Sequence, residues 1–149
     1  MTTMAPGDGD GDGDGGNTRT PLAAGELNVA FRGLDCIDVA ALLEWRRTQQ
    51  TADDGDVPMT AATTTAVIAS SNVLTAFPYH LATDCPSLHR LLLTWNKLRS
   101  LQPMPSTPLT PFHALHHLDL GFNKLTALPT SLPTTLPNLR TLVLNDNAL

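Results

Sequence analysis

The side chains best suited to chemistry form a short cluster in the second half of the chain. His113, His116 and His117 are followed closely by Asp119. Imidazole nitrogens and carboxylate oxygens are ordinary zinc ligands, and a zinc site needs at least three protein ligands. If this segment is a strand, His116 and His117 point to opposite faces, so only His117 and Asp119 share a side. Two ligands are too few, and we predict no metal site here.

A second group of carboxylates lies near the start of the chain. Residues 8–13 match the D-x-D-x-D-G opening of a calcium-binding loop. The last position of such a loop must be a bidentate Glu, and here it is Arg19. We therefore predict that residues 1–21 are a disordered Asp/Gly-rich tail, because glycine has no side chain to bury and the aspartates repel one another.

Motifs of the common enzyme classes do not occur in the sequence. There is no H-E-x-x-H helix, no phosphate-binding glycine loop and no G-x-S-x-G turn. No nucleophile stands beside a base in a way that the sequence shows. We predict a chain that is not an enzyme and that uses no cofactor.

A spacing of leucines and asparagine indicates the elements that position these residues. The pattern L-x-x-L-x-L-x-x-N-x-L begins at Leu88, Leu115 and Leu139, so its starts lie 27 and 24 residues apart. This is the leucine-rich repeat pattern, whose unit is roughly 20–29 residues long. Apolar residues at positions 4 and 6 alternate with variable residues, which predicts a short strand with one buried face. The Asn at position 9 can bond backbone groups that a tight turn leaves unpaired.

Two weaker units precede these three and start near residues 24 and 64. Between them, apolar residues at helical spacing predict a helix at 36–48, capped by Asp35 or Asp38, followed by a flexible insertion at 49–63. We predict one leucine-rich repeat domain over residues 22–149. Its fold is an α/β solenoid, a horseshoe segment with short parallel strands on the concave face, mostly irregular or extended convex segments and one N-terminal helix.

In this fold, the side chains at positions 3, 5, 7 and 8 face the concave surface. The middle of that surface mixes aromatic, aliphatic and charged side chains, a composition typical of protein-binding hot spots. The predicted partner-binding residues are Arg90, Leu92, Trp95, His117, Asp119, Phe122 and Val143. In an alternative interpretation, an aromatic side chain at position 8 simply covers the asparagine turn. We weigh the two interpretations evenly for Trp95 and prefer the covering role for Phe31 and Phe122.

Charge and cysteine content narrow the class of partner. The net charge is −5, but residues 15–149 hold 10 acidic and 9 basic side chains, a net charge of −1. The sequence shows no basic surface of the kind that binds nucleic acid. The sequence contains no apolar run of about 18 residues, so we predict no membrane span, and no apolar leader is visible at the start. Cys36 and Cys85 are isolated, so we predict a cytoplasmic protein without membrane or nucleic-acid partners.

The order of the segments resembles that of one family. The segment L-N-V-A-F-R-G-L at 27–34, a helix, a polar insertion and then S-S-N-V-L at 70–74 are similar to the leucine-rich repeat-containing protein 51 family. The resemblance covers Leu27–Leu42 and Val67–Leu149. It implies a cytoplasmic, non-enzymatic binding protein and suggests an association with cilia. Chains of the family continue into a capping region, which has no counterpart here after Leu149, and lack the Asp/Gly-rich tail.

We therefore predict a protein–protein interaction module that binds its partner through the concave face. Three alternatives stay open. The first is an ectodomain fragment of an extracellular or membrane receptor, which predicts a leader and paired cysteine caps. The second is a truncated piece of a larger leucine-rich repeat protein, with its activity, enzymatic or not, beyond Leu149. The third is a degraded copy that no longer folds.

Overall fold

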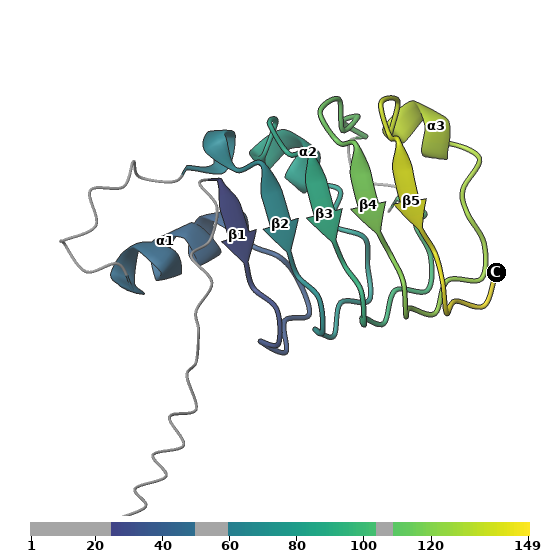
Figure 1. Ribbon diagram of the computed structural model, residues 1–149, viewed down its shortest axis with the longest axis horizontal. Helices are drawn as coiled ribbons and strands as arrows, with labels where there is room; N and C mark the ends of the chain where they lie inside the picture. The colour runs from purple at the N-terminus through teal and green to yellow at the C-terminus, as the bar shows by residue number, and fades with distance from the viewer. Residues whose placement is uncertain (1–24, 50–59, 104–108) are drawn as a thin grey trace, which may run out of the picture.

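The centre of the molecule is a single parallel sheet whose five strands follow one another in chain order (Figure 1). The computed structural model describes residues 25–49, 60–103 and 109–149. The strands are β1 (Glu26–Asn28), β2 (Ala66–Ile68), β3 (Arg90–Leu92), β4 (His117–Asp119) and β5 (Thr141–Val143). A few short helices accompany this sheet, so the arrangement is α/β and the predicted parallel strands are confirmed. The predicted tail at 1–21 lies outside the described residues.

Each strand occupies the same place in its unit, at positions 3 to 5 counted from residues 24, 64, 88, 115 and 139. The central residues pair in register, in the order Leu27, Val67, Leu91, Leu118 and Leu142. The first four are buried, while Leu142 in β5 is half-buried. Because successive side chains of a strand alternate between its faces, positions 3 and 5 lie on the opposite side, which we call the strand face.

The backbone ladder continues past these short strands. The N–H at position 6 donates to the position-5 carbonyl of the next unit, as the Leu93 N–H does to Asp119 (2.8 Å). The N–H at position 8 donates to the position-7 carbonyl of the next unit, as the Trp95 N–H does to Gly121 (3.1 Å). The turns that follow the strands are therefore stacked at the same spacing as the strands themselves.

The hydrophobic core lies behind the sheet, on the side away from the strand face. Leucines of the strands meet aromatic side chains of the returning segments there. The ring of Phe77 contacts those of Tyr79 and Phe112 edge-on, with centroids 4.9 and 5.9 Å apart. Two short helices, α2 (Leu81–Asp84) and α3 (Leu132–Thr135), contribute further buried residues.

The helix beside β1 begins later than the sequence predicts. A helix was expected at 36–48, and α1 spans Val39–Gln49 (Figure 1). The side chain of Asp38 accepts a hydrogen bond from the Ala41 N–H (3.0 Å), so Asp38 caps the helix and the helix starts directly after it. No helix in the described ranges is long and apolar enough to cross a membrane.

The structure also differs from the predicted insertion at 49–63. Its last residues form a 3₁₀ turn, η1 (Ala61–Thr63). Thr60 and Thr63 cap each other: the Thr60 N–H donates to the Thr63 hydroxyl (2.9 Å) and the Thr63 N–H to the Thr60 hydroxyl (3.3 Å). This reciprocal pair is what orders a segment that composition alone makes look flexible. Residues 50–59 lie outside the described part of the chain.

Candidate functional site

The turns after the strands are built around a row of asparagines at position 9. The side-chain amide of Asn96 donates to the carbonyls of Ala69 and Leu93 (both 3.0 Å), and its oxygen accepts from the Leu74 N–H (3.1 Å). Asn72, Asn123 and Asn147 make the corresponding bonds in their own units. Each amide thus joins its own turn to that of the preceding unit and satisfies buried backbone groups.

An unusual backbone conformation occurs at position 8, the residue before each asparagine and, in the first unit, before Arg32. Position 8 has a positive φ in all five units, between 53° and 58°. The residues are Phe31, Ser71, Trp95, Phe122 and Asp146. The left-handed region is unfavourable for most side chains, and Asn, Asp and Gly tolerate it best. An aromatic residue here therefore works against the backbone preference of the turn.

Trp95 and Phe122 stack on each other in the open. Their ring centroids are 4.1 Å apart and their planes differ by 4°. Trp95 is 59% exposed, Phe122 37% and Phe31 82%. The covering role that we preferred for Phe31 does not hold, because so exposed a side chain covers little of the turn beneath it.

The other predicted binding residues lie on the strand face. Arg90 in β3 is in register with His117 in β4, and Leu92 with Asp119, which is followed by Val143 in β5. Arg90 is exposed and the remaining four are half-buried. The structure therefore places the five side chains on three adjacent strands, next to the turns that carry the aromatic stack.

Beside this face, the absence of a side chain at Gly121 leaves room for the Asn145 side chain. An added Cβ at Gly121 would lie 2.6 Å from the side-chain oxygen of Asn145, and the Gly121 N–H donates to the carboxylate of Asp119 (3.0 Å). A larger residue here would push the Asn145 side chain aside. The Asp119 carboxylate is thus oriented by its own turn.

The fold separates the two histidines, His116 and His117, that were considered as metal ligands. His116 stands beside His89 of the neighbouring unit, with ring centroids 5.4 Å apart, while His117 lies on the strand face. No group of three His, Cys, Asp or Glu side chains within the described ranges is placed to hold a metal ion. Sequence reasoning missed the His89–His116 pair; aligning position 2 of the units would have brought the two residues together.

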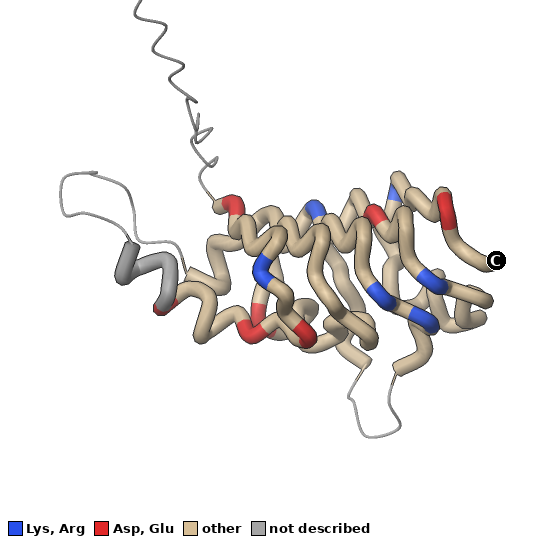
Figure 2. The backbone as a smooth tube through the Cα atoms, turned by 90° about the horizontal axis from the view of Figure 1, so that it is seen from below, with Lys and Arg blue, Asp and Glu red and all other residues tan. Residues whose placement is uncertain are grey.

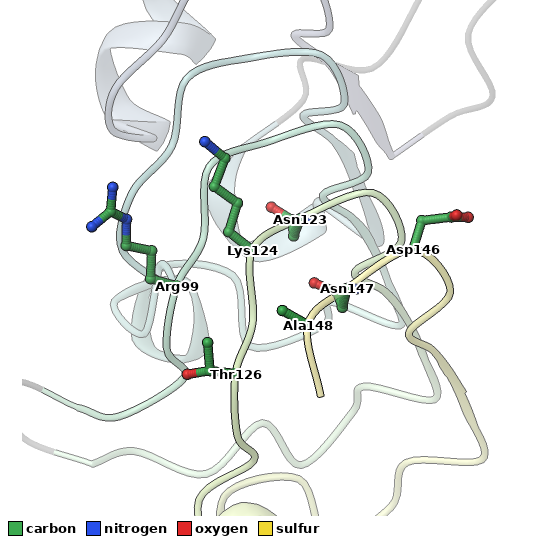
Figure 3. A pocket seen from close by; sticks show the side chains of 7 residues that line it. All are labelled: Arg99, Asn123, Lys124, Thr126, Asp146, Asn147 and Ala148. Carbon is green, nitrogen blue, oxygen red and sulfur yellow. The ribbon is translucent and has the colours of Figure 1, made fainter.

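A shallow cavity of about 600 Å³ opens on the loops that follow β3, β4 and β5. It is lined by Arg99, Asn123, Lys124, Thr126, Asp146, Asn147 and Ala148. Arg99 and Lys124 extend along one side and Asp146 along the other (Figure 3). Lys and Arg positions gather on these loops toward the C-terminal end (Figure 2). This surface is not evident from the sequence, because its charges come from different units.

Neither cysteine has the environment of a nucleophile. Burial raises the pKa of the Cys85 thiol to about 11. Cys36 is exposed, and a hydrogen bond with the Asp35 side chain, together with the nearby carboxylate charges, raises its pKa. A reactive cysteine needs a lowered pKa, so both thiols stay protonated at neutral pH.

No family model matches this chain, and no curated protein matches it. The function is therefore argued from the geometry of the surface. The side chains that stand out are the exposed aromatic pair Trp95–Phe122 and the strand-face residues beside it. They provide apolar area, hydrogen-bonding groups and both signs of charge within one continuous surface.

Proposed function

We propose that this chain is a leucine-rich repeat solenoid that binds a partner protein through the concave side of its sheet and catalyses no reaction. Sequential parallel strands in one register and the bonded asparagine row support the solenoid. The raised pKa values of the Cys36 and Cys85 thiols argue against either cysteine acting as a nucleophile.

The observation that carries the proposal is the exposed Trp95–Phe122 stack at two left-handed positions. A residue with a side chain loses about 1–2 kcal/mol in this conformation, and Asn or Gly would lose less. The stack leaves large apolar surfaces in water, so the fold gains little from it. Large aromatic side chains are the commonest anchors of protein interfaces, which accounts for their presence here.

The strand face supplies the rest of such an interface. Leu92 and Val143 offer aliphatic area between Arg90, His117 and Asp119, which can pair with polar and charged groups of a partner. An aromatic anchor surrounded by a mixed polar rim is the usual anatomy of a protein-binding site. The residues of this chain proposed to bind the partner are therefore the same seven that the sequence predicts.

The cytoplasmic location, the ciliary association and the kinship with the leucine-rich repeat-containing protein 51 family are further parts of this proposal. They rest on the isolated cysteines and on the resemblance of Leu27–Leu42 and Val67–Leu149. Microscopy of the tagged chain in ciliated cells tests the location. Signal at the cilium or its base supports the ciliary association, and signal confined to the secretory pathway contradicts the cytoplasmic assignment.

Affinity capture with matched variants tests the binding role. The tagged chain and its Trp95→Asn, Phe122→Asn and Leu128→Asn variants are used to capture proteins from an extract, and each captured protein is quantified by mass spectrometry. Leu128 is 38% exposed, close to the 37% of Phe122, but follows the turn instead of lying at position 8, so it controls for loss of apolar surface.

We expect a partner that the wild-type chain and Leu128→Asn capture equally. Its affinity for Trp95→Asn falls at least tenfold, a loss of about 1.4 kcal/mol that is modest for a hot-spot residue. Equal capture by all four proteins would show that the aromatic stack is not the binding site.

A further inference from the structure

The position-8 side chains form one evenly spaced row along the sheet. All five share the same backbone conformation, with φ between 53° and 58°. The first four are held by the same bond, from their own N–H to the position-7 carbonyl of the next unit, at 2.9 to 3.1 Å. Neighbouring places in the row are therefore separated by one strand spacing, about 4.8 Å.

One step along this row accommodates one ring. Trp95 and Phe122 occupy neighbouring places and stack in parallel with centroids 4.1 Å apart. Ser71 occupies the place before Trp95, and Phe31 the place before Ser71. Phe31 and Trp95 are two places apart, roughly 10 Å along the row, and serine puts no ring between them. That separation leaves room for one planar group between the two places.

The exposed fractions follow the same order. Phe122, which has Trp95 on one side and Asp146 on the other, is 37% exposed. Trp95, with a ring on one side only, is 59% exposed, and Phe31, with no ring beside it, is 82% exposed. Exposure is therefore highest at Phe31, which has no neighbouring ring. We call the space above Ser71, between Phe31 and Trp95, the Ser71 slot.

The base of the Ser71 slot is polar. Ser71 supplies one hydroxyl, and the preceding residue Ser70 has a hydroxyl that accepts a hydrogen bond from the Thr94 hydroxyl (2.7 Å). A bound group therefore meets two aromatic walls and a floor of hydroxyls. This combination suits a flat side chain with an apolar face, with or without a polar tip.

We propose that the Ser71 slot binds an aromatic side chain of the partner protein, which would complete a stack of four rings with Phe31, Trp95 and Phe122. This inference rests on the proposed binding function, because the inserted ring belongs to the same partner. The stacking of Phe122 on the other face of Trp95 is the precedent within the molecule. Arginine is the other planar candidate, and the titration with two small probes distinguishes it from an aromatic ring.

A variant of the chain alone tests the geometry. Ser71→Trp places an indole in the slot at a φ that Phe31, Trp95 and Phe122 already adopt. We expect it to stack on Trp95 and to produce an exciton couplet in circular dichroism that disappears in Ser71→Trp/Trp95→Asn. Thr126→Trp, on the loops outside the row, serves as the control and gives no couplet. A folded Ser71→Trp without a couplet overturns the slot.

Small probes test the chemistry. N-acetyl-phenylalanine amide and N-acetyl-arginine amide are titrated separately into the full chain and followed by two-dimensional NMR. We expect the phenylalanine probe to shift signals of Phe31, Ser71 and Trp95 with a dissociation constant on the order of millimolar, as a single-side-chain ligand allows. Ser71→Phe fills the slot and weakens this binding at least tenfold. Tighter binding of the arginine probe, or no binding of either, overturns the assignment.

Capture of the partner by two variants distinguishes a failure of this inference from a failure of the proposed function on which it rests. If capture of the partner is lost in both Ser71→Phe and Trp95→Asn, both proposals are supported. If Ser71→Phe captures the partner fully and Trp95→Asn does not, the binding function stands and the slot proposal is wrong. If neither substitution affects capture, both are wrong. Melting temperatures of the two variants check that each is folded.

Discussion

Positions 8 and 9 of the repeating unit are neighbours in the chain but follow opposite rules. At position 9, four units carry Asn, and each amide makes the same bonds to its own turn and the preceding one. At position 8, the backbone is equally constant, with φ between 53° and 58°, while the side chain is Phe, Ser, Trp, Phe or Asp.

The difference shows which atoms the fold requires. In four units the amide at position 9 bonds its own turn, and in the first unit, where Arg32 occupies position 9, Asn72 of the next unit bonds the turn. The backbone conformation at position 8 is the same in all five units whatever the side chain, provided that the residue tolerates the left-handed region. Residue choice at position 8 is therefore free to serve binding. The following predictions test this division, beginning with the largest expected effect.

Asn96→Ala should destabilise the fold by about 3 kcal/mol or more. It leaves the buried N–H of Leu74 without its partner, which costs about 1–3 kcal/mol. It also removes one of the two amide bonds to each of the carbonyls of Ala69 and Leu93, which keep their bonds to Asn72 and Asn123, at about 0.5–1.5 kcal/mol for each lost bond. Urea denaturation followed by circular dichroism measures the change. A loss below about 1 kcal/mol would mean that water replaces the amide and that position 9 is not essential.

Labelling of Cys85 should report the same loss. This thiol is buried, so a thiol reagent reaches it only when the structure opens, whereas Cys36 is exposed throughout. A loss of about 3 kcal/mol in Asn96→Ala raises the Cys85 labelling rate on the order of 100-fold. Cys36→Ala in the same background removes the fast phase. An unchanged Cys85 rate would place that region outside the unit that Asn96 stabilises.

Asn147→Ala should cost less, about 1 kcal/mol. Asn147 makes the same set of bonds, but it and its acceptors in Leu144 and Asn145 are half-buried or exposed, so water can satisfy part of what is lost. The same urea titration measures it. A cost equal to that of Asn96→Ala would show that the bonds matter regardless of their burial.

Trp95→Asn should change the stability by less than about 1 kcal/mol in either direction. It loses a stacking contact worth about 0.5–1.5 kcal/mol and gains a residue that tolerates the left-handed conformation at φ 57°. The two effects nearly cancel. Thermal melts of Trp95→Asn and Trp95→Gly against wild type check this, and a large drop in both variants would assign the stack to the fold.

The sequence alone predicts the places of the strands and of the asparagine turns. The alternation of apolar residues around Leu91 and Leu118 places the strands, and Asn96 and Asn123 mark the turns, because burial and backbone satisfaction are local demands. The seven predicted binding residues follow from that register. The helix cap was ambiguous, since both Asp35 and Asp38 have suitable side chains, and only the geometry decides between them.

Contacts between units were harder to predict. The stacking of Trp95 on Phe122 and the pairing of His89 with His116 join residues 27 apart in the chain. They depend on the exact stacking of the turns and on which way a left-handed residue directs its side chain. The vacant place at Ser71 is visible in the sequence only after position 8 is read down all five units.

The measurement that tests this account most directly is a side-by-side urea titration of wild type, Asn96→Ala and Trp95→Asn. The account predicts that Asn96→Ala loses about 3 kcal/mol of unfolding free energy and that Trp95→Asn stays within about 1 kcal/mol of wild type. Equal losses in the two variants would contradict it, because the exposed aromatic row would then be as necessary to the fold as the buried asparagines.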